Sequence, residues 1–370
     1  MITDTVTSGF FKEHVLAGKP YKGGSTREEI ATDKKIFKLS SNENPLGPSP
    51  KAIAAMQQQL SMLHEYSFQD DMRLKDALEH YFHFTLQAEQ FITANSGLEI
   101  IDMVVRGFLD PGLECIISSP TFLAYKNFAE LQGARVIDVP LDPINFSLDA
   151  DAILDAVNEN TRVIFLCSPN NPTATVIPKK KLEKILDSIP DHVVVVYDEV
   201  YAHFTRHREF TRAFDFVKQN KNVIGLNSFS KAFGLAGLRI GYAYTTLEIA
   251  EYLDHLQRPF MINSLSTVGA IAALKDLNHI LNTQKLVRDE KRWLYEELGE
   301  LSVFYWASEA NFILFRAPYD NKKFAADMLG EGIMVRTTDP FGLPGCIRLS
   351  IGAHEANRAC VEAIKKLANK

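Results

Sequence analysis

The sequence predicts an α/β fold with two unequal domains, and three observations lead to this expectation. From residue 91 to about residue 226, short apolar segments alternate with segments of helical periodicity, as in a mainly parallel sheet between helices. The apolar segments lack polar alternation, as expected for strands covered on both faces. After about residue 245 the order changes to a long helical stretch, then strands and a last helix, which is typical of a smaller α+β domain.

The individual elements follow from apolar spacing and from the turn formers between them. A run rich in Asn, Gly and Pro over 42–50 cannot be regular structure. Two helices are expected after it, the first over 51–60 and the second over 72–84. The expected strands of the first domain are 91–94, 114–118, 135–139, 163–166, 193–197 and 223–226, with helices over 97–108 and 122–131. The second domain is expected to hold helical residues 247 to about 298 with a break near Pro259, strands 312–315, 333–335 and 347–350, and a helix from Glu355.

At 370 residues the chain is too long for one simple core. We expect residues 1–40 to form an N-terminal arm that packs on the small domain or on a partner subunit. Residues 41–245 would form the large domain, and residues 246–370 a linking helix and a small C-terminal domain.

Composition narrows the class of partner. The net charge of −6 argues against nucleic acid, which favours a basic face. The longest apolar run, 193–197, is far too short to cross a bilayer, and the first residues lack the apolar segment of a signal peptide. Four cysteines lie far apart, as buried thiols in a reducing cytoplasm do. We therefore expect a cytoplasmic protein that binds neither nucleic acid nor membrane.

The segment after the strand 223–226 carries the most informative residues. Lys231 lies between small hydroxyl residues and Arg239, a set that suits a Schiff base to a phosphate-bearing aldehyde. In this interpretation the amine holds the carbon atom, while Ser228, Ser230 and Arg239 hold the phosphate. Taken alone, the segment is equally well explained as a Ser-rich turn before a helix with solvated basic residues.

Other residues that follow strands complete this set, because ligands of open α/β sheets bind beyond the carboxyl ends of the strands. Ser96, Gly97 and Leu98 open a helix whose free N–H groups suit a phosphate, or simply form an ordinary cap. Phe122 can stack on a flat heterocycle, although a place in the core explains it as well.

Two further strand ends supply polar groups. Asn171 precedes a proline that holds it extended, so its amide can be directed toward a ring hydroxyl, or it belongs to a plain turn. Asp198 ends an apolar strand, where a carboxylate needs a partner such as a pyridinium nitrogen, and Tyr201 follows it. Metal binding at Asp198 and Glu199 is the rival interpretation, but the sequence contains no HExxH motif, and we expect no metal. Together, these residues predict a site for a phosphorylated pyridine aldehyde.

With these motifs the chain resembles the fold-type I, class I/II aminotransferases, and within them the histidinol-phosphate aminotransferase branch. The resemblance extends over nearly the whole chain, through Asn42-Glu-Asn44-Pro45, Ser168-Pro-Asn-Asn171-Pro-Thr173, Tyr197-Asp198-Glu199-Val-Tyr201, the segment from Ser228 to Arg239, and Arg348. It implies a large domain with a mainly parallel sheet of the seven-stranded type, the cofactor pyridoxal 5'-phosphate, and a homodimer.

The resemblance also implies a role for each matching residue. Lys231 would form the Schiff base and move the proton, Asp198 would keep the ring nitrogen protonated, and Tyr201 with Asn171 would bond the phenolic oxygen. Phe122 would stack on the ring, and the phosphate would be held by Ser96, Gly97, Leu98, Ser228, Ser230 and Arg239. Arg348 would pair with a substrate acid group, and Tyr66 would reach the neighbouring active site across the dimer interface.

Four positions depart from the family pattern. Ala174 replaces a glycine of the motif, so this turn is expected to differ slightly, and Asn95-Ser-Gly-Leu98 replaces the usual Gly-Ser-Asp. Tyr66 is followed by Ser67-Phe68-Gln69 instead of Pro-Asp, and Phe122 lacks the hydroxyl of the usual tyrosine. The last three departures bear on histidinol phosphate as substrate more than on transamination.

The expected reaction moves an amino group between L-histidinol phosphate and a 2-oxo acid (2-oxoglutarate/glutamate) by a ping-pong mechanism. One substrate carries a phosphate and the other two carboxylates, so dual-purpose arginines are expected, with Arg336 and Arg348 as candidates. Tyr21, Asn44 and Tyr66 complete the expected substrate-binding residues. Alternatives are an aromatic or broad-specificity aminotransferase and a threonine-phosphate-type decarboxylase. A pyridoxal-sensing regulator is discounted, because no room for a DNA-binding domain precedes Asn42.

Overall fold

The computed structural model describes residues 11–18, 34–67 and 71–368. A seven-stranded sheet forms its centre, in the order β2-β8-β7-β6-β5-β3-β4. Its strands are β2 (Phe91–Ala94), β3 (Glu114–Ile117), β4 (Arg135–Asp138), β5 (Thr161–Cys167), β6 (Val194–Asp198), β7 (Val223–Ser228) and β8 (Gly241–Tyr244). Only β8 runs antiparallel to its neighbours in this sheet, so the other strands end at the same edge. The expected mainly parallel sheet is confirmed.

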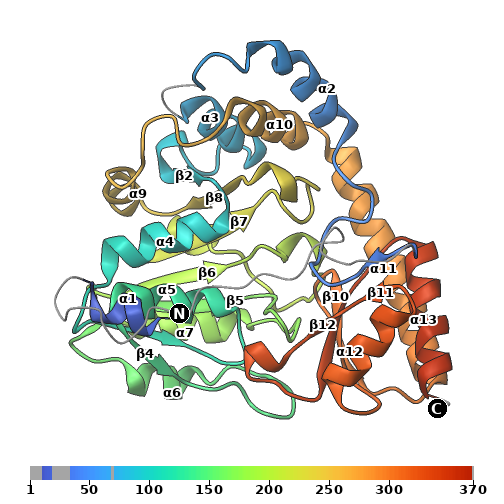
Figure 1. The fold of residues 1–370 in the computed structure, drawn as a ribbon. Helices are drawn as coiled ribbons and strands as arrows, with labels where there is room; N and C mark the ends of the chain where they lie inside the picture. The colour runs from blue at the N-terminus through green and yellow to red at the C-terminus, as the bar shows by residue number, and fades with distance from the viewer. Residues whose placement is uncertain (1–10, 19–33, 68–70, 369–370) are drawn as a thin grey trace.

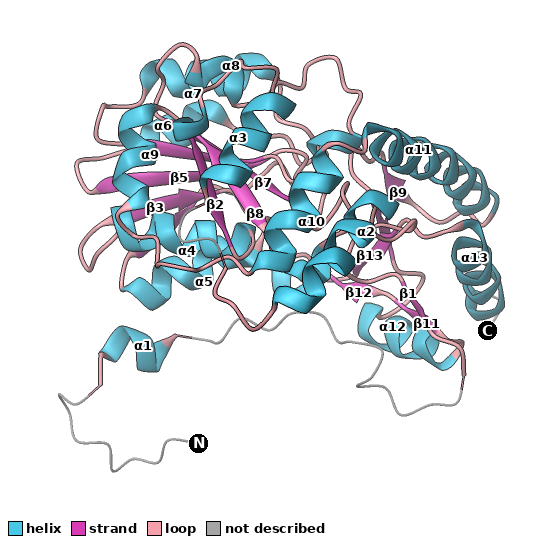
Figure 2. Ribbon diagram, turned by 90° about the horizontal axis from the view of Figure 1, so that it is seen from above, coloured by secondary structure: helices cyan, strands magenta, loops and turns pink. Residues whose placement is uncertain are grey.

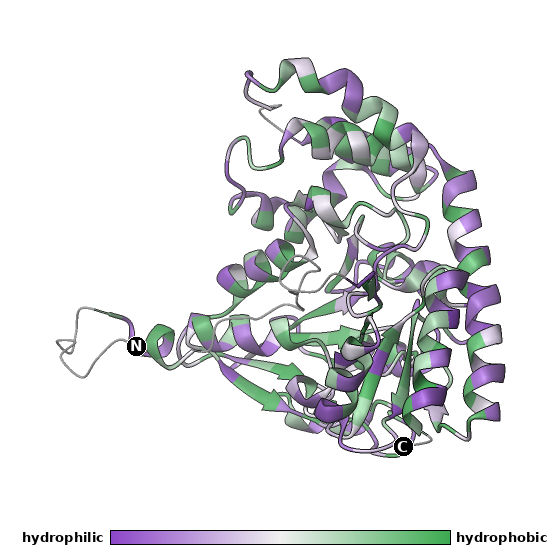
Figure 3. Ribbon diagram, turned by 45° about the vertical axis from the view of Figure 1, so that its right-hand side comes forward, coloured by the Kyte–Doolittle hydropathy of each residue, from purple (hydrophilic) through white to green (hydrophobic). Residues whose placement is uncertain are grey.

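Helices cover both faces of this sheet (Figures 1 and 2). On one face α4 (Gly97–Phe108), α5 (Leu123–Gln132) and α9 (Leu247–Asp254) bury apolar residues against alternate strand positions. The opposite face packs on α3 (Met72–Tyr81), α6 (Ala150–Ala156), α7 (Lys179–Ser188) and α8 (Phe214–Val217). Strands buried on both sides explain why their sequences read as continuous apolar runs. In Figure 3 the strands accordingly carry the hydrophobic colour and the outer helix faces the hydrophilic one.

A second group of strands lies beside the first. The antiparallel sheet β12-β13-β10-β9 contains β9 (Tyr305–Trp306), β10 (Phe312–Arg316), β12 (Arg336–Thr337) and β13 (Cys346–Ser350). Helices α11 (Leu277–Glu300), α12 (Asn321–Gly330) and α13 (His354–Ala368) pack around it (Figure 1). A parallel pair joins β1 (Phe37–Lys38) to β11 (Ile333–Met334), so the segment before the large sheet returns to the C-terminal strands.

The remaining helices pack against one another or against helices of the large sheet. Helix α10 (Ser264–Leu274) packs against α2 (Pro50–Gln59) and α3, on the side of the large sheet (Figure 1), and α1 (Glu13–Ala17) packs against α5. The boundary that we propose near residue 245 falls between the seven-stranded and the four-stranded sheet, while the β1–β11 pair contains one strand from each side of it. Helices α9 and α10, which lie beyond the boundary, pack with the earlier elements.

Three sequence expectations need correction. The stretch expected as helical from Leu247 to about Leu298 is interrupted twice, once between α9 and α10 and once between α10 and α11. Asp276 lies at the second interruption, where its carboxylate accepts a hydrogen bond from Ser49 Oγ (2.6 Å). The strand expected over 333–335 is limited to β11, and an unexpected strand, β12, follows it in a different sheet. Strand β8 was not expected, since its four residues follow directly on the Arg239 segment.

Within the described residues, no helix has the length and apolar character to cross a membrane.

Gly241 lets β8 pass directly beneath the start of α4. A Cβ atom there would lie 2.5 Å from the backbone nitrogen of Gly97 and 2.6 Å from the carbonyl carbon of Ser96. We expect Gly241→Ala to lower the free energy of unfolding by about 1–3 kcal/mol, as overpacking does, and to weaken anion binding at this helix start. Thermal unfolding and cofactor titration check both effects. Gly237→Ala, where no atom lies within 4 Å, is the matched control and should leave both unchanged.

Candidate active site

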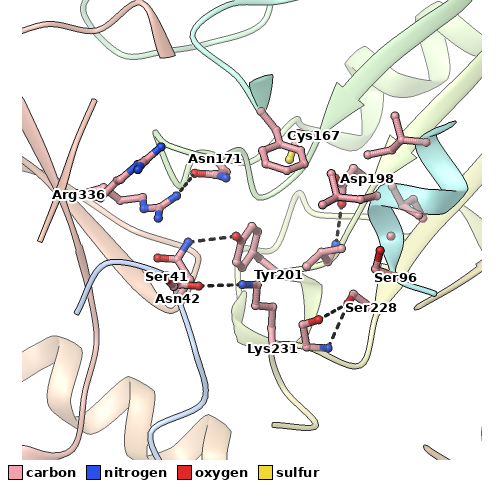
Figure 4. A pocket seen from close by; sticks show the side chains of 18 of the residues that line it. Ser41, Asn42, Ser96, Cys167, Asn171, Asp198, Tyr201, Ser228, Lys231 and Arg336 are labelled. Carbon is pink, nitrogen blue, oxygen red and sulfur yellow. Dashed lines mark hydrogen bonds between the residues drawn. The ribbon is translucent and has the colours of Figure 1, made fainter. Parts of the chain in front are cut away.

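A cavity of about 240 Å³ lies beyond the carboxyl ends of the large sheet, between that sheet and the strands β12 and β13. Its lining contains every residue that the sequence predicts for cofactor binding: Ser96, Gly97, Leu98, Phe122, Asn171, Asp198, Tyr201, Ser228, Ser230, Lys231 and Arg239. Arg336 and Arg348 also line it. Figure 4 shows Asp198, Tyr201, Ser228 and Lys231 around one shared space.

Lys231 follows β7 and reaches into this cavity with its amine. Its Nζ donates to the backbone oxygen of Ser41 (2.9 Å), a bond drawn in Figure 4. Removal from water, and then the positive charges of Arg348 and Arg239, lower the pKa of Lys231 to about 8. A substantial neutral fraction near neutral pH is what a nucleophilic lysine requires.

Asp198 is the last residue of β6, and it is buried. Its Oδ2 accepts a hydrogen bond from Tyr125 Oη (2.6 Å) and its Oδ1 accepts one from the Val200 amide (3.1 Å). Burial raises the pKa of Asp198 to about 6, while the Tyr125 hydrogen bond, the Val200 amide and the charge of Lys231 act in the opposite direction. A buried carboxylate of this kind is stabilised by a cationic N–H partner.

Tyr201 and Asn171 form the side of the cavity nearest to Arg348. Tyr201 Oη accepts a hydrogen bond from Asn42 Nδ2 (3.0 Å), and burial raises the pKa of Tyr201, so its phenol remains protonated. Asn171 Oδ1 accepts from Arg348 Nη1 (2.7 Å), which fixes the amide so that its NH2 group is the one left for a ligand. Arg348 Nη2 donates to the Ser40 carbonyl (2.5 Å).

The start of α4 and the loop after β7 together form an anion cradle. Ser96 caps α4 through Glu99 N (3.4 Å), and its own backbone has φ 116°. Because Ser96, Gly97 and Leu98 line the cavity, the N-terminus of this helix lies at its edge. The Ser228 and Ser230 hydroxyls bond each other (2.9 Å). Arg239 adds a positive charge from a left-handed backbone conformation (φ 54°) just before β8. Helix N-terminus, hydroxyls and guanidinium are donors that fit a phosphate.

Phe122 immediately precedes α5, and it presents its ring to the cavity. It packs edge-on to Tyr125, with ring centroids 5.6 Å apart. A flat ring in this position supplies a stacking surface for a heterocycle without a hydrogen bond.

Two of the remaining expected substrate residues, Asn44 and Tyr66, are not part of the cavity lining. Asn44 donates to the Ala232 carbonyl (2.9 Å) and to Thr283 Oγ1 (3.1 Å), contacts that hold two chain segments together. Tyr66 is 87% exposed and lies 5.0 Å from the Phe260 ring, and Tyr21 lies outside the described residues.

Two neighbouring positions of the motifs are explained by the structure. Ala174 adopts φ 59°, the left-handed conformation that favours glycine, so the turn keeps the backbone that a glycine would take. Glu199 is fully buried away from the cavity, where Asn227 Nδ2 (2.9 Å), the Ala213 amide (3.1 Å) and the Tyr244 hydroxyl donate to its carboxylate. Its role is structural.

Several lining residues were not among the sequence predictions, namely Ser40, Ser41, Asn42, Ile101, Cys167, Val200, Leu226 and Phe341. Ser40, Ser41 and Asn42 belong to the segment before α2. Ser40 and Ser41 offer backbone oxygens to the site, and Asn42 offers its side-chain amide. Tyr125 was also missed, although it lies one helical turn after Phe122 and shares its face.

Comparison with known proteins places this geometry. The model of the family "Aminotransferase class I and II" matches residues 34–367. The chain belongs to the class I and II aminotransferases. It is 35% identical over 360 residues to the histidinol-phosphate aminotransferase of Moorella thermoacetica, covering 96% of this chain and 92% of that protein. It is 36% identical over 350 residues to that of Symbiobacterium thermophilum, covering 94% and 95%.

Among solved structures, histidinol-phosphate aminotransferase from Sinorhizobium meliloti in complex with pyridoxal-5'-phosphate has a TM-score of 0.86 at 22% identity, covering 99% of this chain and 100% of that one. This neighbour has the same fold. The family match and the relatives identify the chain as a pyridoxal-phosphate-dependent aminotransferase. The donor set fits that cofactor, because one cavity offers an anion cradle, an aromatic ring, a buried carboxylate and an amine of lowered pKa.

Proposed function

We propose that this aminotransferase transfers the amino group of L-histidinol phosphate to 2-oxoglutarate, as a step of histidine biosynthesis. The relatives named above are histidinol-phosphate aminotransferases, and this chain matches each of them over nearly its whole length. The observation that carries the proposal is the pair Arg336 and Arg348, which are direct partners on β12 and β13 and both line the cavity. Two cations at one end suit a phosphate in one half-reaction and a carboxylate in the other.

The roles of the chain's residues follow from their surroundings. Pyridoxal phosphate, when bound, supplies an aldehyde for the amine and a ring that withdraws electrons from it. Lys231 is the nucleophile and the base that moves a proton at the substrate carbon, since its pKa is lowered toward neutrality. The ionised carboxylate of Asp198 accepts a hydrogen bond from the ring nitrogen and so keeps the proton on that nitrogen. Tyr201 and Asn171 donate hydrogen bonds to the ring oxygen and orient it. The cradle of Ser96, Gly97, Leu98, Ser228, Ser230 and Arg239 holds the phosphate.

The two arginines sit beside one aromatic ring at the substrate end. The guanidinium carbons of Arg336 and Arg348 lie 5.9 Å and 5.7 Å from the centre of Phe341, and Arg348 is only 6% exposed. Stacking restrains the guanidinium groups and leaves their edges for anions. Arg348 is buried and bonds to Asn171 and Ser40, whereas Arg336 is the more exposed of the two in the cavity lining. We therefore assign Arg336 to the phosphate of histidinol phosphate.

We further propose a homodimer with Tyr66 reaching the partner's active site. Support comes from exposed apolar side chains on α2, on the segment from α2 to Tyr66, and at Phe260, whose ring lies 5.0 Å from that of Tyr66. Ile53, Leu60, Met62, Leu63 and Phe260 are each at least 39% exposed. Contiguous exposed apolar groups mark interaction surfaces. Four buried thiols without disulfides support a cytoplasmic location.

A half-reaction without 2-oxo acid tests the substrate. Histidinol phosphate added to the yellow holoenzyme should abolish its visible absorbance, whereas histidinol, which lacks the phosphate, should require a far higher concentration. Arg336→Ala should raise the concentration of histidinol phosphate needed by roughly 10- to 100-fold, the cost of a charge-assisted hydrogen bond.

Arg316→Ala is the control, because Arg316 stacks on Phe304 and is exposed on β10, outside the cavity. It should behave as the wild type. Phenylalanine reacting where histidinol phosphate fails would favour the aromatic aminotransferase instead, and release of carbon dioxide from a phosphorylated amino acid would favour the decarboxylase.

A further inference from the structure

Tyr125 lies behind the cavity wall, where it is fully buried in α5. Its ring stacks on Phe165 of β5, with centroids 4.8 Å apart and an interplanar angle of 7°. This packing fixes the ring plane, and with it the direction of the hydroxyl. The hydroxyl is directed at Asp198 Oδ2, 2.6 Å away.

Both oxygens of Asp198 therefore have a fixed donor. Tyr125 Oη serves one oxygen and the Val200 amide the other, at 3.1 Å. A phenol whose own pKa burial raises well above the usual value cannot lose its proton here, so it acts only as a donor to the carboxylate. Two donors favour the ionised carboxylate over the neutral acid, against the effect of burial.

We propose that Tyr125 is a positioning residue of the reaction, which orients Asp198 and keeps it ionised so that a proton rests on the ring nitrogen and not on the carboxyl group. The inference rests on the role proposed above for Asp198. It does not depend on the identity of the amino donor.

The other titratable groups around Asp198 do not replace this contact. Cys167 of β5 is paired with Asp198 in the sheet register, but its thiol bonds to the Pro169 carbonyl (3.4 Å) and burial raises its pKa well above the usual value. Lys231 acts on Asp198 through its charge, and its Nζ bonds to Ser41. Tyr201 bonds to Asn42.

The test is Tyr125→Phe, which removes one oxygen atom and keeps the stacked ring. In the cofactor-free protein, pH-dependent infrared spectra report the protonation of Asp198, assigned by subtracting the spectra of Asp198→Asn. The midpoint should move up by about one pH unit, and the dissociation constant of pyridoxal phosphate should rise about tenfold, as for loss of a hydrogen bond to a charged group. We also expect kcat to fall about tenfold while KM changes little.

Tyr197→Phe is the matched control. Tyr197 is equally buried, precedes Asp198 in β6, and donates its hydroxyl to the Thr211 carbonyl (3.3 Å) on the other side of the sheet. It should lower stability and leave the Asp198 midpoint unchanged. The inference is overturned if Tyr125→Phe keeps the wild-type midpoint, or if Tyr197→Phe moves it equally. Wild-type cofactor affinity and turnover in Asp198→Asn would be a different failure, since they would remove the role of Asp198 itself.

Discussion

Replacement of Lys231 by alanine is expected to lower kcat by at least about 10³-fold while the protein stays folded. Proton transfer by a positioned group alone contributes roughly 10²–10⁴ in rate, and this lysine also supplies the nucleophile. Among the residues that line the cavity, Lys231 is the lysine, its pKa is lowered to about 8, and its amine bonds to a backbone oxygen instead of a carboxylate. Steady-state kinetics with histidinol phosphate and 2-oxoglutarate measure the loss.

Cofactor binding should largely survive in Lys231→Ala, because the anion cradle, the stacking ring and Asp198 do not involve the lysine side chain. Lys291→Ala is the matched control. Lys291 is another largely buried lysine whose pKa burial lowers to about 8, but it donates to the Ser308 carbonyl (2.8 Å) in a different cleft. Turnover near the wild-type rate in Lys231→Ala, or an equal loss in Lys291→Ala, would remove the proposed role.

Asp198→Asn should produce the second largest loss, roughly 10²- to 10⁴-fold in kcat. An amide cannot balance a positive ring nitrogen, and breaking a buried charge pair costs about 3–5 kcal/mol. The amide also presents an N–H group toward the ring or toward Tyr125, whose hydroxyl already donates to this position. Rapid kinetics of the half-reaction with histidinol phosphate measure the effect directly.

Glu199→Gln serves as the control for burial and charge at the neighbouring position. Glu199 is as buried as Asp198, but its partners are Asn227, Ala213, Tyr244 and, at 3.5 Å, Arg212, all away from the cavity. This variant should unfold at a lower temperature and keep its kcat within about threefold. An Asp198→Asn enzyme no slower than Glu199→Gln would contradict the assignment of Asp198 to the ring.

The elements next to the site could be predicted from sequence because their signals are local. Strand β2 and helix α4 have the predicted bounds, since an apolar run ends at Ala94 and a capping Ser96 begins the helix two residues later. The cofactor residues lie at or just after the ends of β2, β3, β5, β6 and β7. Parallel strands end at one edge of a sheet, so the convergence of these residues in one cavity follows from topology.

The residues that could not be predicted depend on distant contacts. The Asn42 amide bonds to Ser350 Oγ (2.7 Å) and its carbonyl accepts from Asn311 Nδ2 (3.0 Å). These bonds fix residues 40–42 beside the cavity, although their partners are about 300 residues away in sequence. The Tyr125–Asp198 bond likewise spans 73 positions. Asn44 occupies a position in the motif where a substrate-binding residue is expected, but its side chain contacts Ala232 and Thr283 instead. The spacing of residues in the sequence does not show which of these contacts is made.

Borohydride reduction of the enzyme with bound pyridoxal phosphate, followed by peptide mapping, tests the central claim most directly. Reduction converts the link between cofactor and lysine into a stable bond, so the label reports which amine forms it. The result predicted here is one labelled peptide, carrying the cofactor on Lys231. A label on Lys291 or on any other lysine, or a protein that takes up no cofactor, would contradict the account.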